Sequence, residues 1–367
     1  MKNYSTKSLL AVLMMLFISF AHAQEEESES TSDDTEVKKK KFTWGGSADV
    51  YYRANIGAPN GGENGQTPNT SLANGHGFSN GMANLILSYE GKKVGAVADL
   101  VFGPRGVDAV FGSLQWDIDG DGTADLGNSS QVVNQLYVYW NVSDRVTLTF
   151  GNFNTFLGYE VISPTGNFNY STSYMFSYGP FSHTGLKMDW AVTDDFSLLL
   201  AVMNDNDFTN FNPENTYTLG AQLAYKDIYL NFLYGYQFQV DLTTGFDITD
   251  SFYLGLNATY FEDRDSDASF YGVAIYPQLQ ISDPFALGFR AEYFAEGEGG
   301  VGAIGGYDAD GDANAFEFTL TGNYAIGDLM IIPEFRIDTT SEDTFLNNDL
   351  ESTGSLASFL VAAVYKF

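Results

Sequence analysis

One repeating pattern limits the fold of this chain more than any other feature of its sequence. From Phe42 onward, segments of about ten residues alternate apolar and polar side chains, as half-buried or membrane strands do. Every second connection between them is a turn of a few residues, such as Ser143-Asp144 or Lys226-Asp227. The remaining connections are mostly long and rich in Gly, Asn and Asp. Short turns alternating with longer loops indicate one antiparallel sheet built from consecutive hairpins.

The last segment, 355–367, indicates that this sheet closes on itself. An apolar-faced strand at the end of a chain needs a partner for its free edge, and closure into a barrel supplies one. Its two faces differ, since Phe359, Val361, Ala363, Tyr365 and Phe367 alternate with Ser358 and Lys366. If the apolar face meets lipid, the chain is an outer-membrane barrel. Phe367 is then also predicted to be an assembly signal for the barrel-assembly machinery.

We predict an all-β fold, a transmembrane antiparallel up-and-down barrel of about sixteen strands; fourteen or eighteen also fit the pattern. The strands are expected near 43–54, 80–90, 93–103, 131–141, 145–153, 182–192, 196–204, 217–225, 228–237, 240–248, 252–262, 269–281, 285–295, 314–325, 328–338 and 355–367. An even number of strands puts both ends of the barrel chain on the short-turn side, which is periplasmic in such proteins.

The alternation predicts which side chains face a lumen. In 285–295, Phe285, Leu287 and Phe289 share one face, and Arg290 and Glu292 share the other. Charged side chains are tolerated in a water-filled lumen and are costly against lipid. The predicted pore-lining residues are Asp49, Arg53, Asp99, Lys187, Asp189, Arg290, Glu292, Glu334, Arg336 and Asp338. Acidic groups outnumber basic ones among the inward positions, so a mild cation preference is expected.

Aromatic residues near strand ends fit the girdles that mark membrane–water interfaces. The candidates for this position are Trp44, Tyr137, Trp140, Trp190 and Tyr225. Ordinary aromatic residues of a soluble sheet are the alternative explanation.

The N-terminal segments predict export. Residues 1–23 carry Lys2 and Lys7, then an apolar run, then the small-x-small sequence Ala21-His22-Ala23, as in a cleaved signal peptide. Residues 24–41 are a charged, periplasmic tail predicted to be disordered, and 42–367 form the barrel. We therefore expect the protein in the cell outer membrane, in contact with lipid and lipopolysaccharide.

The third long connection, 154–181, carries six aromatic residues. Such residues would be unusually exposed on an outer loop, but inside a barrel they could pack. We predict that this loop folds inward and narrows the lumen, with Tyr159, Glu160 and Tyr170 at the constriction. The alternative is a loop that stays at the surface.

The second long loop contains a motif typical of calcium-binding loops. Asp117, Asp119, Asp121 and Asp125 are spaced as oxygen ligands around a turn at Gly122, and the position of the usual closing Glu is Asn128. We predict a weak structural Ca²⁺ site there, with a plain acidic loop as the alternative. A second motif, Asp308, Asp310 and Asp312, lacks the corresponding glycine. No other cofactor is required.

Other functions find little support. The chain has no Cys and three His, and no HExxH or GxSxG motif is present, so we predict no enzyme and no catalytic residue. A formal net charge of -30 excludes nucleic acid as a partner.

Several short sequences resemble the OmpL-like β-barrel porin-2 family. They are Gly151-Asn152-Phe153-Asn154-Thr155, Gly158-Tyr159-Glu160, Asn167-Phe168-Asn169-Tyr170-Ser171, Gly179-Pro180-Phe181-Ser182-His183 and Met203-Asn204-Asp205. Asn152 stands where the family pattern leads us to expect Lys. The resemblance implies an outer-membrane porin of Bacteroidetes-type bacteria and names no solute.

We therefore expect a porin for passive diffusion of small hydrophilic solutes, in an architecture that often forms homotrimers. A channel selective for saccharides or organic ions, and a non-conducting surface or adhesion barrel, are the alternatives.

Overall fold

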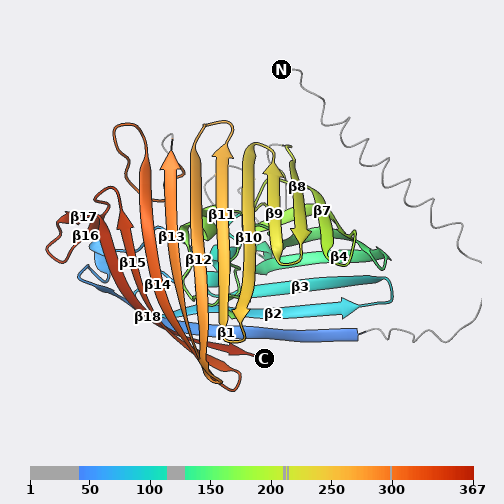
Figure 1. Ribbon diagram of the computed structural model, residues 1–367, viewed down its shortest axis with the longest axis horizontal. Coiled ribbons are helices and arrows are strands. Elements are labelled where there is room, and N and C mark those ends of the chain that lie inside the picture. The colour runs from blue at the N-terminus through green and yellow to red at the C-terminus, as the bar shows by residue number, and fades with distance from the viewer. Residues whose placement is uncertain (1–40, 114–128, 210–211, 213–214, 298–299) are drawn as a thin grey trace, which may run out of the picture. The chain divides into compact units, whose positions relative to one another are not determined.

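The computed structural model describes residues 41–113, 129–209, 212, 215–297 and 300–367, which form a closed antiparallel barrel (Figure 1). The first eight wall strands are β1 Lys41–Ile56, β2 Gly77–Glu90, β3 Val94–Phe102, β4 Val133–Ser143, β5 Val146–Asn154, β6 Ser182–Ala191, β7 Phe196–Met203 and β8 Thr218–Tyr225. The other eight are β9 Ile228–Tyr234, β10 Gln237–Thr249, β11 Phe252–Asp263, β12 Ser269–Ser282, β13 Phe285–Gly297, β14 Ala313–Ile326, β15 Leu329–Thr340 and β18 Ser355–Lys366.

The predicted all-β barrel is confirmed, with sixteen strands in the wall. Each strand pairs with its neighbour in sequence, and β1 closes the barrel against β18 in the register Ser47↔Lys366. The remaining elements belong to the connections: η1 Gly62–Asn64, α2 Pro104–Ala109, η2 Ser129–Val132, η3 Pro164–Gly166, α3 Tyr174–Tyr178, and the hairpin of β16 Phe345–Leu346 with β17 Ser352–Thr353. None of the described helices is long and apolar enough to span a bilayer.

The two faces of the wall differ as the alternation predicts. On β15, Phe335 is exposed on the outer face, whereas Glu334, Arg336 and Asp338 are buried on the inner face. A soluble sandwich shows the opposite arrangement, with apolar side chains inside and polar ones outside. An apolar exterior around a polar interior is the arrangement of a membrane barrel.

Two details differ from the sequence-based prediction. Tyr137 points into the barrel and packs near Phe153 and Leu199, while its neighbours Leu136 and Val138 are exposed, so it is not part of an outer girdle. Strand β10 begins at Gln237 rather than residue 240. The polar Gln237 and Gln239 resemble loop residues, but they continue the inward-facing set of that strand.

The predicted signal peptide and nearly all of the tail lie outside the described residues.

The C-terminal residue helps to close the barrel. The Phe367 backbone N–H donates to the Gly46 carbonyl at 3.0 Å, and the Phe367 carbonyl accepts from the Gly46 N–H at 3.0 Å. Its ring lies 6.0 Å from that of Trp44 on the outside of β1. At Phe367 the backbone therefore pairs with β1 to close the barrel, and the ring is a separate, exposed feature on the outer face.

Replacing Phe367 with alanine keeps both backbone bonds and removes only the ring. If the ring is read during assembly, the folded yield in the outer membrane should fall several-fold, and the conductance of the folded fraction should not change. Heat-shifted mobility on gels measures folded yield, and Phe335→Ala, another exposed outer position, is the control. Equal yields for the two variants would contradict the assembly role.

Candidate functional site: a loop held inside the barrel

The connection between β5 and β6, residues 155–181, lies inside the barrel, and we call it the inner loop. Its backbone bonds to inward side chains on separate parts of the wall. The Gly158 N–H donates to Asp241 of β10 at 2.9 Å, and the Tyr174 N–H donates to Glu292 of β13 at 2.8 Å. The Tyr170 N–H donates to Glu334 of β15 at 2.9 Å. The loop thus crosses the interior. Whether it limits conductance stays a prediction.

Glycines on the inner wall make room for the loop's large side chains. A Cβ atom at Gly288 would lie 2.2 Å from the Phe168 ring, and one at Gly255 would lie 2.5 Å from the Tyr159 ring. Both distances are far below van der Waals contact, so the wall is hollowed where the loop packs. Phe156 and Met175 occupy the corresponding spaces at Gly220 and Gly272. This complementarity fixes one position of the loop, because packed interiors tolerate little overlap.

Filling one of these spaces should displace the loop. In Gly288→Val the side chain would overlap Phe168, so we expect a loss of about 1–3 kcal/mol in unfolding free energy and an altered single-channel conductance. Urea unfolding in liposomes and planar-bilayer recording measure the two effects. The control is Ala291→Val, on the outer face of the same strand. Identical behaviour of the two variants would show that the loop does not depend on this contact.

Two arginines on adjacent parts of the wall bind the loop through a buried charge cluster. Arg290 of β13 contacts Glu160 of the loop at 2.6 Å and Glu317 of β14 at 2.8 Å. Arg336 of β15 contacts Asp338 at 2.7 Å and lies 3.7 Å from Glu317. We call these five residues the clamp. All of them are almost completely inaccessible to solvent, and each arginine contacts two carboxylates, with Glu317 shared between the two.

The same arginines also hold the loop backbone. Arg290 Nη1 donates to the Ser171 carbonyl at 2.7 Å, and Arg336 Nη1 donates to the Thr172 carbonyl at 2.7 Å. Glu160 accepts from the Ser173 N–H at 2.8 Å, which orients the start of α3. Asp49 of β1 accepts from the Tyr170 hydroxyl. The loop is therefore held on both its side chains and its main chain.

Arg105 of α2 also contacts the inner loop, and the sequence analysis did not identify it. It is buried, donates to the Ile162 carbonyl at 3.0 Å and to the Tyr170 carbonyl at 3.1 Å, and lies over the Tyr170 ring. The sequence does contain a feature that could have identified Arg105, because it is one of only two Lys or Arg residues in the described outer loops. A basic residue so isolated among acidic loops indicates a buried partner.

The predicted pore-lining residues fall into two groups. Asp49, Arg290, Glu292, Glu334, Arg336 and Asp338 bind the inner loop or the clamp, and Arg53 is buried beside them without a hydrogen-bond partner for its terminal nitrogens among the described residues. Lys187 and Asp189 of β6 remain partly exposed and form a 2.8 Å ion pair. Asp99 of β3 is buried and accepts from Asn134 at 2.7 Å. Their part in permeation stays a prediction.

The predicted constriction residues are all engaged within the interior. The Tyr159 ring stacks on Tyr276 at a centroid distance of 4.1 Å, and its hydroxyl donates to that of Tyr253 at 3.3 Å. Glu160 belongs to the clamp, and Tyr170 is fully buried between Tyr51 and Arg105. Most of the hydrogen-bonding capacity of these three side chains is used to hold the loop.

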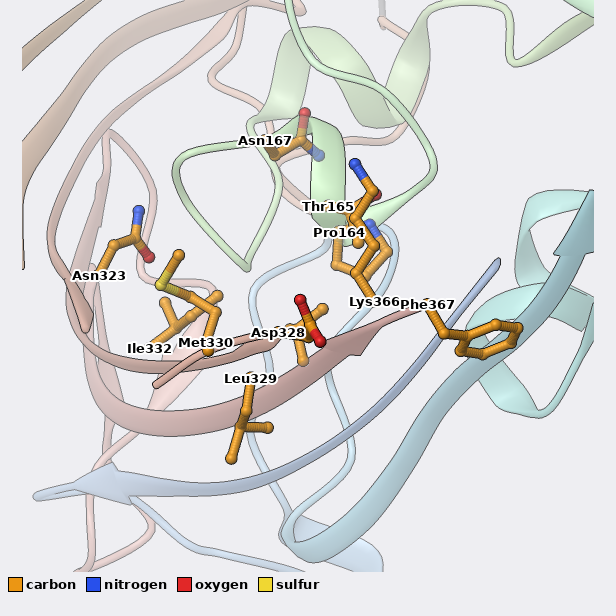
Figure 2. A pocket seen from close by; sticks show the side chains of 12 residues that line it. Pro164, Thr165, Asn167, Asn323, Asp328, Leu329, Met330, Ile332, Lys366 and Phe367 are labelled. Carbon is orange, nitrogen blue, oxygen red and sulfur yellow. The ribbon is translucent and has the colours of Figure 1, made fainter. Parts of the chain in front are cut away.

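Space remains at the short-turn end of the barrel. A cavity of about 550 Å³ separates the tip of the inner loop from β14, β15 and β18 (Figure 2). Pro164, Thr165 and Asn167 line the loop side, and the opposite wall includes Asn323 and Met330. The inner loop thus leaves a mixed polar and apolar vestibule on this side.

The predicted calcium ligands Asp117, Asp119, Asp121 and Asp125 lie outside the described residues. Within the described part of the chain, no group of three or more acidic, His or Cys side chains is arranged to hold a metal. At the second motif, Asp308 instead accepts from the N–H groups of Asp312 and Asp310 at 3.0 and 2.9 Å. These donors lower the pKa of Asp308, as expected for a carboxylate that closes its own turn.

Comparisons with known proteins agree with this architecture. Residues 41–367 match the family described as "Putative beta-barrel porin-2, OmpL-like". The outer membrane channel DcaP of Acinetobacter baumannii is similar in structure, with TM-score 0.53 and 10% identity over 92% of this chain and 100% of that one. The trimer form of OmpT, an outer membrane protein of Vibrio cholerae, gives TM-score 0.51 and 10% identity over 89% and 99%. No curated protein sequence matches the chain.

Proposed function

This chain belongs to the OmpL-like β-barrel porin-2 family, and we propose that it is a diffusion porin for small hydrophilic solutes. Family membership makes it an outer-membrane porin and points to a non-enzymatic channel. The observation that carries the diffusion mechanism is the inner loop, which occupies part of a sixteen-stranded barrel and leaves a vestibule beside it. A barrel of this size encloses an aqueous channel unless other segments fill it.

We propose a mild cation preference that originates at the outer rim. The clamp charges are buried and paired with one another, so we expect them to contribute less to the field in the lumen than exposed charges do. The described outer loops carry many exposed carboxylates, including Asp265, Asp308 and Glu351, and Arg264 is the only exposed Lys or Arg in them. A mouth lined by one sign of charge concentrates ions of the opposite sign.

The reversal potential in a potassium chloride gradient tests this proposal. We expect cations to be preferred a few-fold at about 0.1 M salt and much less at about 1 M, because the Debye length falls from about 10 to about 3 Å. Neutralising Asp308, Asp310 and Asp312 together should weaken the preference, whereas Asp338→Asn should leave it unchanged in molecules that fold. Anion preference at low salt would contradict the proposal.

A channel selective for saccharides or organic ions is the second candidate. It is favoured by partly exposed amide and aromatic side chains on the inner wall, among them Gln135, Tyr137, Gln222, Tyr253 and Gln278. Such groups form hydrogen bonds and stacking contacts with sugars. Liposome swelling with graded sugars separates the candidates, since a rate set by solute size indicates diffusion and saturation indicates selectivity. A non-conducting surface barrel predicts neither swelling nor current.

We further propose a homotrimer embedded in lipid and lipopolysaccharide and inserted by the barrel-assembly machinery after the signal peptide is cleaved. The trimer form of OmpT supports the oligomer by similarity of fold only. A weak structural Ca²⁺ site at Asp117, Asp119, Asp121 and Asp125 also remains a proposal. Calcium titration of D119N against the parent protein tests it.

A further inference from the structure

The barrel wall is not equally high all round. Strands β5 to β9 contain 9, 10, 8, 8 and 7 residues, and we call them the short wall. Strands β12 and β14 contain 14 residues each, and Figure 1 shows the contrast between β7–β9 and their tall neighbours. At about 3.3 Å per residue and a tilt of about 40°, eight residues rise about 20 Å and fourteen about 35 Å.

The tall side presents an outer face that matches a bilayer. On β14 the exposed outward residues run from Phe316 through Phe318, Leu320 and Tyr324 to Ile326. These ten steps along the strand correspond to about 25 Å along the membrane normal, which is the height of the apolar band in outer-membrane barrels. Lipid can therefore cover this side completely.

The short wall presents a lower apolar face, most clearly on β5 and β6. On β6 the outward series Trp190, Met188 and Leu186 changes to the polar Thr184, whose hydroxyl donates to the Thr209 carbonyl of the next outer loop at 3.2 Å. On β5 the outward series ends at Phe150. Three outward residues on each of these two strands correspond to only about 10 Å of apolar height, and the four outward apolar residues on each of β7, β8 and β9 correspond to about 15 Å. A bilayer would have to thin by about 10 to 15 Å to match this wall.

Exposed apolar side chains continue above this low face, on a loop. Phe111 is 60% exposed and Val107 is 52% exposed, although both belong to the polar connection between β3 and β4. Phe111 packs edge-on against Phe181, immediately before β6, which places it at the top of the short wall. Exposed aromatic residues at loop height would face water, so they indicate cover by protein.

We propose that the short wall and the Phe111 region face a second copy of this chain. A copy related by closed rotational symmetry presents the same low wall, so the heights of the two apolar faces agree. The tall strands of every copy then face lipid, and their apolar height fits it. Leu200 and Leu223, which are 41% and 40% exposed on β7 and β8, would be covered in the assembly. This goes beyond the proposed homotrimer, because it assigns the contact face.

The absence of Cys allows single reporter sites. Leu200→Cys on the short wall and Leu320→Cys on the tall wall replace the same residue type at similar exposure, 41% and 46%. Each variant carries a nitroxide spin label in phospholipid vesicles, and its collision rate with dissolved oxygen reports contact with acyl chains. Heat-shifted gel mobility confirms folding, and Leu223→Cys repeats the short-wall measurement.

We expect the label at position 200 to be several-fold less accessible to oxygen than the label at 320. We also expect dipolar broadening of the nitroxide spectrum, caused by labels on neighbouring copies, only at 200 or 223. Equal accessibility, or shielding at 320 instead, would overturn the proposal. Native mass spectrometry gives the oligomeric state and single-channel recording gives the pore separately. A shielded tall wall in a trimer would thus refute the assigned face alone, and a conducting monomer would refute the face and the trimer but not the porin.

Discussion

Replacing Arg290 with methionine should destabilise the barrel by about 3–5 kcal/mol, because it leaves buried carboxylates without their cation. Arg290 bonds to Glu160 and Glu317 and is fully buried with them. Methionine keeps much of the volume, so the loss arises mainly from uncompensated charge. Urea unfolding in liposomes measures the change, and an increase in current noise should accompany it as the inner loop loosens.

Arg145→Met is the matched control. Arg145 forms an ion pair with Asp194 at 3.1 Å, but both side chains are largely exposed, so its loss should cost at most about 1 kcal/mol. Adding Glu160→Gln to Arg290→Met should recover part of the stability, since one unpaired charge is removed. A loss from Arg290→Met no larger than the control would mean that the clamp does not hold the loop.

The wall of the barrel could be predicted from the sequence because its determinants are local. Alternation along each strand, Asp or Gly in short turns, and the apolar series that ends at Phe367 are all visible within a few residues. Tyr137 is the instructive exception. An aromatic residue near a strand end fits a girdle by its type, but only its register with Leu136 and Val138 shows that it faces inward.

The use of the inward charges could not be predicted in the same way. Glu292 and Arg336 have the spacing of lumen residues whether they face water or a folded loop, since polar side chains satisfy both environments. Whether such a side chain faces water or a loop depends on its partners, and these are distant in sequence: Arg290 contacts Glu160, which is 130 residues away. The spaces at Gly255 and Gly288 could not be predicted from the sequence either, because a glycine in a strand does not show which side chain packs against it.

Deleting residues 160–175 should raise single-channel conductance by about two-fold or more, because a sixteen-stranded barrel is wide enough for an aqueous channel once nothing fills it. The deletion removes Glu160, the tip at Pro164–Gly166 and the first two residues of α3, and with them the main contacts between the clamp and the loop. Planar-bilayer recording measures the change. Shortening the exposed hairpin tip at 347–350 is the control, and it should leave conductance unaltered.

The same deletion should also increase cation preference. It would expose Asp49, Glu292, Glu317, Glu334 and Asp338 to the lumen against four arginines, at positions 53, 105, 290 and 336. Asp49, Glu292 and Glu334 would lose their hydrogen bonds to the loop, so these three carboxylates would act directly on passing ions. Unlike the rim effect, this preference should persist at about 1 M salt, since ions would pass within the short Debye length of the charges. Unchanged conductance with unchanged selectivity would show that the inner loop does not form the constriction.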